Sequence, residues 1–176
     1  MKARFYSRPP VPKTNTFPQI GAAAIIIFEN KLLVEKRSDS GKWCFIGGGM
    51  KENESIEACI VREVKEETGL ILQATNFKLF RIYSNPYRIA AYSDGNIRRI
   101  FTTAFIHQSH SKIPIVKMSG ESRALAWVDV NGLLALDFAE THTEIRADFC
   151  KWHLNGLLGN EKHHLNFHHE AMEVMK

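Results

Sequence analysis

The sequence has no long hydrophobic run. Its longest apolar stretch, Ala22–Phe28, is far too short for a membrane-spanning helix, which needs about 20 apolar residues. Residues 1–5 contain no apolar segment of the kind found in signal peptides. We therefore expect a soluble, cytoplasmic protein that does not associate with membranes.

Cysteines are few and widely spaced. Cys44, Cys59 and Cys150 form no Cys-x-x-Cys pair, and their number is odd. The sequence therefore indicates neither a disulfide framework nor a zinc site, and we expect reduced thiols.

The chain also lacks a strong excess of one charge. Its 23 Lys and Arg against 19 Asp and Glu leave a net charge of +4. This charge suits small anionic substrates but is too low to indicate a nucleic-acid partner. The length of 176 residues and the hydrophobic content of 44% are enough for one domain with one core.

Composition divides the chain into three parts. Residues 1–17 are rich in proline and basic residues and lack periodicity, so we expect an irregular arm. Residues 18–159 carry the apolar segments of a folded domain, and residues 160–176 form a polar tail. The tail holds two histidine pairs, His163-His164 and His168-His169. On a helix two of these side chains could bind a transition metal, but a solvated tail is favoured.

Apolar segments bounded by turn residues predict a series of strands. The expected strands are 20–28, 31–37, 43–46, 71–83, 88–92, 97–108 and 122–130. Asp94-Gly95 predicts a hairpin turn, and Thr141 with Glu144 fits a capping box that opens a helix. With another helix expected at 54–68, this order predicts an α/β fold of the α+β kind, a three-layer α/β/α sandwich around a mixed β-sheet.

The helix expected from Glu54 to Thr68 has recognisable ends. Asn53 can cap its first turn, Glu54 complements the positive end of the helix dipole, and Gly69 can end it. The run Gly47–Gly49 precedes the helix, and glycines there let the backbone approach an ion or a phosphate closely.

Three carboxylates of this helix are expected on its core-facing side. At about 100° per residue, Glu63, Glu66 and Glu67 project toward the same side as the apolar residues. Partly desolvated carboxylates are costly without compensation, so a cation should lie among them, and oxygen ligands favour Mg²⁺ or Mn²⁺. Arg62 can pair with Glu66 one turn further on and hold a neighbouring carboxylate. The alternative is a charged helix that is merely solvated.

The stretch from Gly48 to Leu70 resembles the signature of the Nudix (MutT-like) hydrolases, Gly-x5-Glu-x7-Arg-Glu-U-x-Glu-Glu-x-Gly-U, in which U is aliphatic. All nine specified positions agree, over 23 of the 176 residues. Ile46 departs from the family pattern, since many members have proline before the paired glycines. This departure affects the rigidity of the loop rather than its chemistry.

The resemblance implies the α/β/α sandwich and a metal-dependent pyrophosphohydrolase. Its substrate would be a nucleoside diphosphate linked to another group X, of the ADP-ribose or nucleotide-sugar type. The implied metal ligands are Glu63, Glu66, Glu67 and the Gly47 carbonyl, with Glu63 positioning or deprotonating the attacking water and Arg62 orienting its neighbours. Two alternatives stay open: a pyrophosphatase that removes oxidised nucleoside triphosphates, and a non-catalytic nucleotide sensor. The intact carboxylates count against the sensor, and a homodimer also stays open.

Further site residues are expected outside the signature. Several family members draw another glutamate from a late loop, and Glu121 matches that place, although a loop glutamate is more often only solvated. Basic side chains elsewhere could bind phosphates. The candidates are Arg37, Arg81 and Arg88.

The group X is not decided by the sequence. In the family, a proline sixteen residues past the signature is linked to ADP-ribose hydrolysis, and Pro86 occupies that position. A tyrosine in the same neighbourhood is linked to dinucleoside polyphosphates, and Tyr87 follows directly. Because both residues are present, either substrate is compatible, and residues 84–86 could equally be a turn between strands.

Overall fold

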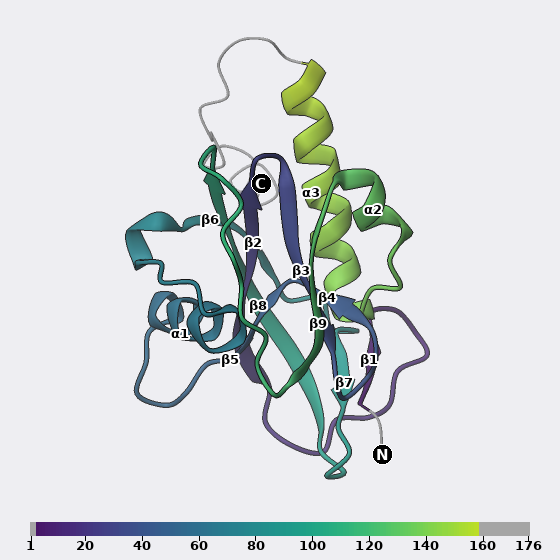
Figure 1. Cartoon of the computed structure of the whole chain (residues 1–176). Helices are drawn as coiled ribbons and strands as arrows, with labels where there is room; N and C mark the ends of the chain where they lie inside the picture. Colours follow the sequence, from purple (N-terminus) through teal and green to yellow (C-terminus); the bar gives the residue numbers. More distant parts are fainter. Residues whose placement is uncertain (1–2, 159–176) are drawn as a thin grey trace, which may run out of the picture. The chain divides into compact units, whose positions relative to one another are not determined.

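The computed structural model describes residues 3–158 (Figure 1). The histidine pairs of the expected tail lie outside these residues. The chain divides into two compact units, one through Ile145 and one from Arg146 onward. No helix of the described residues is long and apolar enough to span a membrane.

A mixed β-sheet built around strand β2 forms the centre of the first unit. β2 (Gln19–Phe28) pairs in parallel with β8 (Ile97–Ser109), and it pairs antiparallel with β3 (Lys31–Arg37) and β5 (Ile46–Gly49). The other strands are β1 (Arg4–Tyr6), β4 (Trp43–Cys44), β6 (Lys78–Tyr83), β7 (Ile89–Ala91) and β9 (Ser122–Val128). The hydrogen-bonded order is β1-β7-β8-β2-β3-β4, with β6 beside β8 and β9 beside β3. The predicted mixed sheet is confirmed.

Residues of β2 are buried on both faces of the sheet. Alternate side chains of a strand point to opposite faces. Ala24 and Ile26 pack in the core formed with Ile60 and Val64 of helix α1 (Ile56–Thr68), whereas Ile25, between them, is fully buried on the other face. This arrangement explains why the strand is almost continuously apolar and confirms the prediction of a strand buried on both sides.

Helices cover both faces of the sheet. α1 contacts β2 and β5, while α2 (Val130–Ala135) contacts β3 and β9, and the two helices lie on opposite sides of these strands (Figure 1). A third helix, α3 (Glu140–Leu158), spans the boundary between the two units. The layers predicted from the sequence are therefore present, and the fold is of the α+β class.

Three predictions about secondary structure are wrong. Residues 71–77 are not strand, because Gln73 and Asn76 bond to each other across a short 3-10 turn at Ala74–Asn76. The arm at 1–17 is not wholly irregular, since β1 pairs with β7. The predicted strand 122–130 ends at Val128, because Asp129 caps α2 by accepting a hydrogen bond from Gly132 N at 2.8 Å.

The N-terminal ends of the two longer helices also differ from the prediction. The cap of α1 is Ser55 rather than Asn53, and its Oγ accepts a hydrogen bond from Ala58 N at 3.1 Å. α3 begins at Glu140, so Thr141 lies inside its first turn instead of capping it. The predicted end of α1 is confirmed, since Gly69 adopts a left-handed conformation with φ of 72°.

The cap of α1 yields a test of this assignment. Ser55→Ala is expected to lower the free energy of unfolding by about 1 kcal/mol, because it leaves the Ala58 amide without its partner. Asn53→Ala is the matched control and should change it by less than about 0.5 kcal/mol, as exposed surface substitutions do. Urea unfolding followed by circular dichroism measures both. Equal losses in the two variants would contradict the assignment.

Candidate metal and nucleotide site

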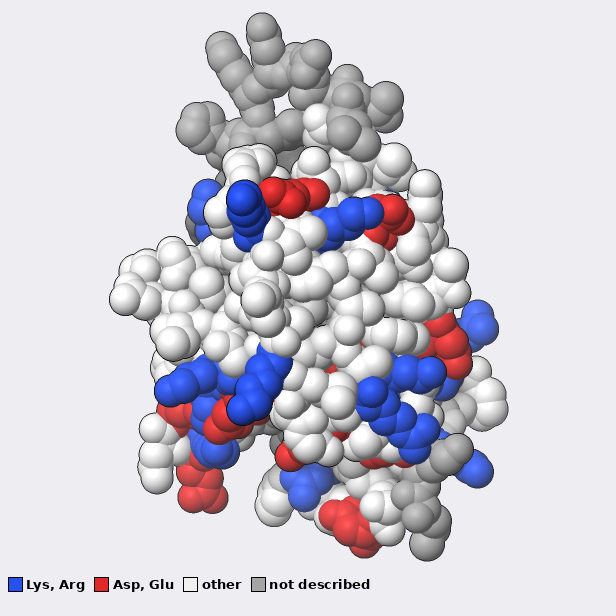
Figure 2. Space-filling model, in the orientation of Figure 1, with Lys and Arg blue, Asp and Glu red and all other residues white. Residues whose placement is uncertain are grey.

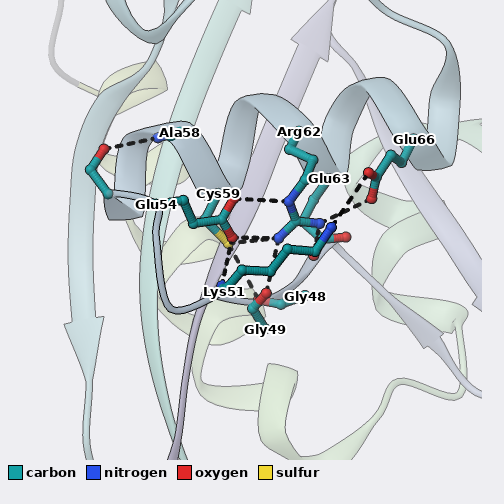
Figure 3. A network of polar contacts seen from close by, with 10 residues as sticks. Gly48, Gly49, Lys51, Glu54, Ala58, Cys59, Arg62, Glu63 and Glu66 are labelled. Carbon is teal, nitrogen blue, oxygen red and sulfur yellow. Dashed lines mark hydrogen bonds and ion pairs between the residues drawn. The ribbon is translucent and has the colours of Figure 1, made fainter.

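Arg62 joins α1 to the loop that precedes it (Figure 3). Its Nε and Nη2 donate to the two carboxylate oxygens of Glu54 at 2.9 and 2.6 Å, and Nη2 also donates to the Gly49 carbonyl at 3.0 Å. Nη1 donates to Glu63 Oε1 at 2.7 Å and to Glu66 Oε2 at 3.0 Å. The predicted pairing of Arg62 with Glu66 is confirmed, and the same guanidinium fixes Glu63.

The three carboxylates predicted on the core-facing side of α1 differ in exposure. Glu67 is buried, with 7% of its surface exposed, and Glu63 is partly buried. Glu66 is different, because 53% of its side chain is exposed. The sequence predicts partly desolvated carboxylates, and Glu66 is the least desolvated of the three, at the solvent edge of the helix. Acidic and basic side chains are intermixed on the surface around α1 (Figure 2).

Glu67 is held in a strongly acidic environment. Its Oε2 accepts a hydrogen bond from Gly47 N at 3.0 Å. Burial raises the pKa of Glu67 to about 9, and the nearby carboxylates of Glu35 and Glu63 act in the same direction. Glu35 is itself buried and accepts a hydrogen bond from Ser122 Oγ at 2.7 Å. Acidic side chains are therefore gathered where burial disfavours their charged form, and a bound cation would offset that cost.

Burial also raises the pKa of Glu63. The hydrogen bond from Arg62 opposes this shift, while the carboxylates of Glu66 and Glu121 add to it. Glu121 is thus close enough to act electrostatically on Glu63, although 58 positions separate them in the sequence.

The glycines of β5 reach the carboxylates because they lack side chains. A Cβ at position 48 would lie 2.5 Å from Glu63 Oε1, and a Cβ at position 47 would collide with the Ala22 carbonyl. Gly47 also has φ of 149°, which side chains rarely tolerate. The register of β2 and β5 causes this close approach, since Ala22 and Ala23 lie opposite Gly48 and Gly47.

Two cavities meet at the carboxylates. One has a volume of about 260 Å³ and the other about 480 Å³, and both are lined by Gly49, Glu63, Glu67 and Glu121. Glu66 lines only the larger cavity. Glu121 is exposed, and its loop contacts β3 through a hydrogen bond from Ser38 N to the Glu121 carbonyl at 3.0 Å. The structure therefore brings the predicted loop glutamate to the signature carboxylates.

The donor set fits a hard divalent ion. Carboxylates and backbone carbonyls supply oxygen ligands alone, which is the chemistry that Mg²⁺ and Mn²⁺ prefer. Within residues 3–158, no three acidic, histidine or cysteine side chains already converge as a metal-binding group. Arg62 instead bonds to both Glu63 and Glu66, so an ion would share these oxygens with the guanidinium.

The predicted substrate residues fall in different places, and Arg88 is buried outside both cavity walls. Arg37 lines the smaller cavity and is fixed by bonds to both Asp39 oxygens at 2.9 and 2.6 Å. Arg81 is exposed on β6 and is not part of either cavity wall. Pro86 and Tyr87 lie in an exposed turn, again outside both walls. In that turn the Tyr87 amide donates to the Asn85 side chain at 3.0 Å, as the alternative turn interpretation predicts.

Sequence reasoning missed much of the smaller cavity. Its wall includes Phe5, Gln19, Tyr92, Thr102 and His142. These residues carry no local motif. The pairing of β1 with β7 and of β2 with β8 brings the strand residues together, and His142 reaches the wall from α3. The polar residue that opens the apolar strand β2, Gln19, was the one available signal, because residues at the ends of elements often line sites.

His142 lies in the cavity wall as a neutral imidazole. Its Nδ1 accepts a hydrogen bond from Phe45 N at 3.3 Å, so the proton of the neutral ring is on Nε2. Burial lowers the pKa of His142 to about 3, with the positive charges of Arg88 and Arg37 acting in the same direction. The ring also stacks on Phe45, with 6.3 Å between centroids.

The neutral state of His142 predicts acid destabilisation. Below its usual pKa of about 6.5, the unfolded chain binds a proton at this ring and the folded chain does not, so stability falls as the pH drops from about 6.5 toward 3. Between pH 7 and 5.5, wild type should lose about 1 kcal/mol more than His142→Gln, which cannot titrate. Urea unfolding at both pH values measures this difference, and parallel pH dependences would contradict it.

The sequence is similar to those of known proteins. A family model described as the NUDIX domain matches residues 18–149. The chain is 30% identical over 138 residues to an ADP-ribose pyrophosphatase of Methanocaldococcus jannaschii, covering 77% of this chain and 75% of the relative. It is 32% identical over 113 residues to the nucleoside triphosphatase NudI of an Enterobacter species, covering 62% of this chain and 79% of the relative.

Solved structures share the fold. A MutT/nudix family protein from Enterococcus faecalis superposes with a TM-score of 0.62 at 18% identity, over 82% of this chain and 65% of that one. The NUDIX domain of Shewanella oneidensis NrtR, solved with ADP-ribose, gives a TM-score of 0.62 at 16% identity, over 83% of this chain and 93% of that one. At these identities the likeness concerns the fold alone.

Proposed function

The chain belongs to the Nudix hydrolase family. We therefore propose that it cleaves the diphosphate of a nucleoside diphosphate linked to a second group, of the ADP-ribose or nucleotide-sugar type. One observation carries the proposal: Glu63, Glu67 and Glu121 line both cavities where these meet. A substrate whose diphosphate lies at this junction has room for a chemical group on each side.

Mg²⁺ or Mn²⁺ fits the oxygen donors of Glu63, Glu66, Glu67 and the Gly47 carbonyl. When bound, such an ion neutralises the diphosphate and activates a water molecule. The chain's own residues would do the remaining work. Arg62 keeps Glu63 in one orientation through the 2.7 Å bond, which limits the reorganisation needed during the reaction.

Glu121 and Glu63 are the candidates for the general base. Each is a carboxylate in the wall shared by the two cavities, and either could take the proton of the attacking water. Arg37 would donate to a phosphate oxygen, because its bonds to Asp39 fix the plane of the guanidinium in the cavity wall.

A nucleoside triphosphate is the second candidate substrate, and the similarity to the NudI triphosphatase favours it. The sensor alternative has no comparable support. A homodimer and a cytoplasmic location stay predictions, and light scattering of the purified protein would test the first.

The experiment is a panel of ADP-ribose, nucleotide sugars, dinucleoside polyphosphates and oxidised triphosphates, each with Mg²⁺ or Mn²⁺ and with phosphatase-coupled detection of both products. We expect one diphosphate-linked substrate to exceed the others in kcat/KM. A triphosphate as the preferred substrate would favour the second candidate. Tight nucleotide binding without turnover would reject hydrolysis in favour of the sensor.

A further inference from the structure

Gln19 presents a pair of hydrogen-bond donors in the wall of the smaller cavity. It is the first residue of β2, and its Oε1 accepts a hydrogen bond from Tyr92 Oη at 2.9 Å. Its Nε2 has no hydrogen-bond acceptor among the described residues. The amide therefore has its oxygen occupied and both N–H groups available to a ligand.

The amide of Gln19 lies next to Gly49 of β5. A Cβ at position 49 would lie 2.5 Å from Gln19 Nε2, so the glycine lets the amide lie close to the backbone of β5. Gly49 lines both cavities together with Glu63, and its carbonyl accepts a hydrogen bond from Arg62. The donors of Gln19 are thus placed next to the junction of the two cavities.

Tyr92 binds the oxygen end of the Gln19 amide. Its ring is partly buried and meets the ring of Phe5 edge to face, with 6.5 Å between centroids. Burial raises the pKa of Tyr92, which keeps the hydroxyl protonated as a donor. Because Tyr92 donates to the amide oxygen of Gln19, the amide nitrogen is the end that lies beside Gly49.

The junction is where a diphosphate would lie, since the acidic residues proposed to bind a cation are there. A neutral amide donor beside that position suits an anionic oxygen, and it adds no charge that would compete with the metal. Resting on the function proposed above, we propose that Gln19 is a substrate-contacting residue whose Nε2 donates to a phosphate oxygen, and that Tyr92 is its positioning residue.

Binding of the α,β-methylene analogue of ADP, measured by calorimetry with Mg²⁺, tests this contact without turnover. Gln19→Ala is expected to weaken binding about 10- to 100-fold, the range for a hydrogen bond to a charged group. Gln19→Glu should bind more weakly still, because its carboxylate repels the diphosphate. Wild-type affinity in Gln19→Ala would overturn the proposal. So would equal affinities of the two variants, since a contact with the nucleoside would not respond to the added charge.

A double-mutant cycle tests the role of Tyr92. Tyr92→Phe keeps the ring and removes the hydroxyl, and it should weaken binding roughly 3- to 10-fold. In the Gln19→Ala background the same change should have no further effect, because Tyr92 acts only through the amide. Additive losses would reject the positioning role. The thermal unfolding midpoints of all variants, measured without the analogue, should stay near that of wild type. Loss of binding through unfolding would not follow the order of affinities expected for the Gln19 and Tyr92 variants.

Failure of this inference is distinguishable from failure of the proposed function. If wild type hydrolyses a diphosphate substrate and the Gln19 variants keep its KM, the function stands and the inference is wrong. If wild type hydrolyses none of the panel, the proposed function is wrong. The titration with the analogue still shows whether Gln19 contacts a phosphate. A wild-type protein that does not bind the analogue overturns the inference as well.

Discussion

Glu67→Gln is expected to lower kcat roughly 1,000-fold on the preferred substrate. The side chain keeps its size, but it loses the charge that would hold a divalent ion, and such an ion contributes several kcal/mol of transition-state stabilisation. The fold should not suffer. Burial already raises the pKa of Glu67 to about 9, and the glutamine oxygen can still accept the hydrogen bond that Gly47 N donates.

Thermal unfolding with and without Mg²⁺ separates these two effects. The midpoint of wild type should rise with Mg²⁺, because a ligand that binds only the folded state stabilises it. Glu67→Gln should unfold at the same temperature as metal-free wild type, or at a higher one, and should not respond to Mg²⁺. The matched control is Glu57→Gln, which changes an exposed glutamate of the same helix and should behave as wild type. Full turnover in Glu67→Gln would refute the placement of the metal.

Glu144→Ala is expected to cost about 2–3 kcal/mol of stability. Its Oε2 accepts a hydrogen bond at 3.2 Å from Nη1 of Arg88, a guanidinium with 0% of its side chain exposed. The other partner of Arg88 is Thr102 Oγ1 at 2.8 Å, and burial lowers the pKa of Arg88. Removing Glu144 leaves the buried charge uncompensated. Glu144 itself is 34% exposed, and solvent screening keeps the expected loss below that of a fully buried pair.

Two further variants show whether the buried charge is responsible. Glu144→Gln keeps an oxygen acceptor and should lose less stability than Glu144→Ala. The double variant Arg88→Met with Glu144→Leu removes both charges and should recover part of the loss, since apolar replacements of buried pairs are often neutral. Urea unfolding of the four proteins measures the effect. A double variant that is less stable than Glu144→Ala would contradict the charge explanation.

Local parts of the structure could be predicted well from the sequence. The strands at 20–28 and 31–37, the end of α1 at Gly69 and the pairing of Arg62 with Glu66 depend on residues close together in the chain. The start of α1 could not be decided in the same way. Asn53 and Ser55 are both good caps two positions apart, and the hydrogen bonds of Glu54 with Arg62 place Glu54 before the helix.

The substrate side of the site was beyond sequence reasoning for a physical reason. Gln19 and Tyr92 are 73 positions apart, and their contact depends on how β2, β7 and β8 align. Pro86 is the opposite case. It stands sixteen residues past the signature, as the family pattern for ADP-ribose hydrolysis requires, but its turn lies outside the cavity walls. Spacing along the chain identifies functional residues that share one helix or strand. The register of the strands decides which distant residues lie opposite them.

The walls of the smaller cavity come from residues as distant as Phe5 and His142, whereas the partners of Arg62 all lie between Gly49 and Glu66. Closing a short loop costs less entropy than closing a long one, so contacts between nearby residues tend to form earlier. During folding, Arg62 and its partners Glu54, Glu63 and Glu66 would therefore come together before the cavity forms. A divalent ion could then bind a partly folded chain at a stage when no nucleotide is recognised.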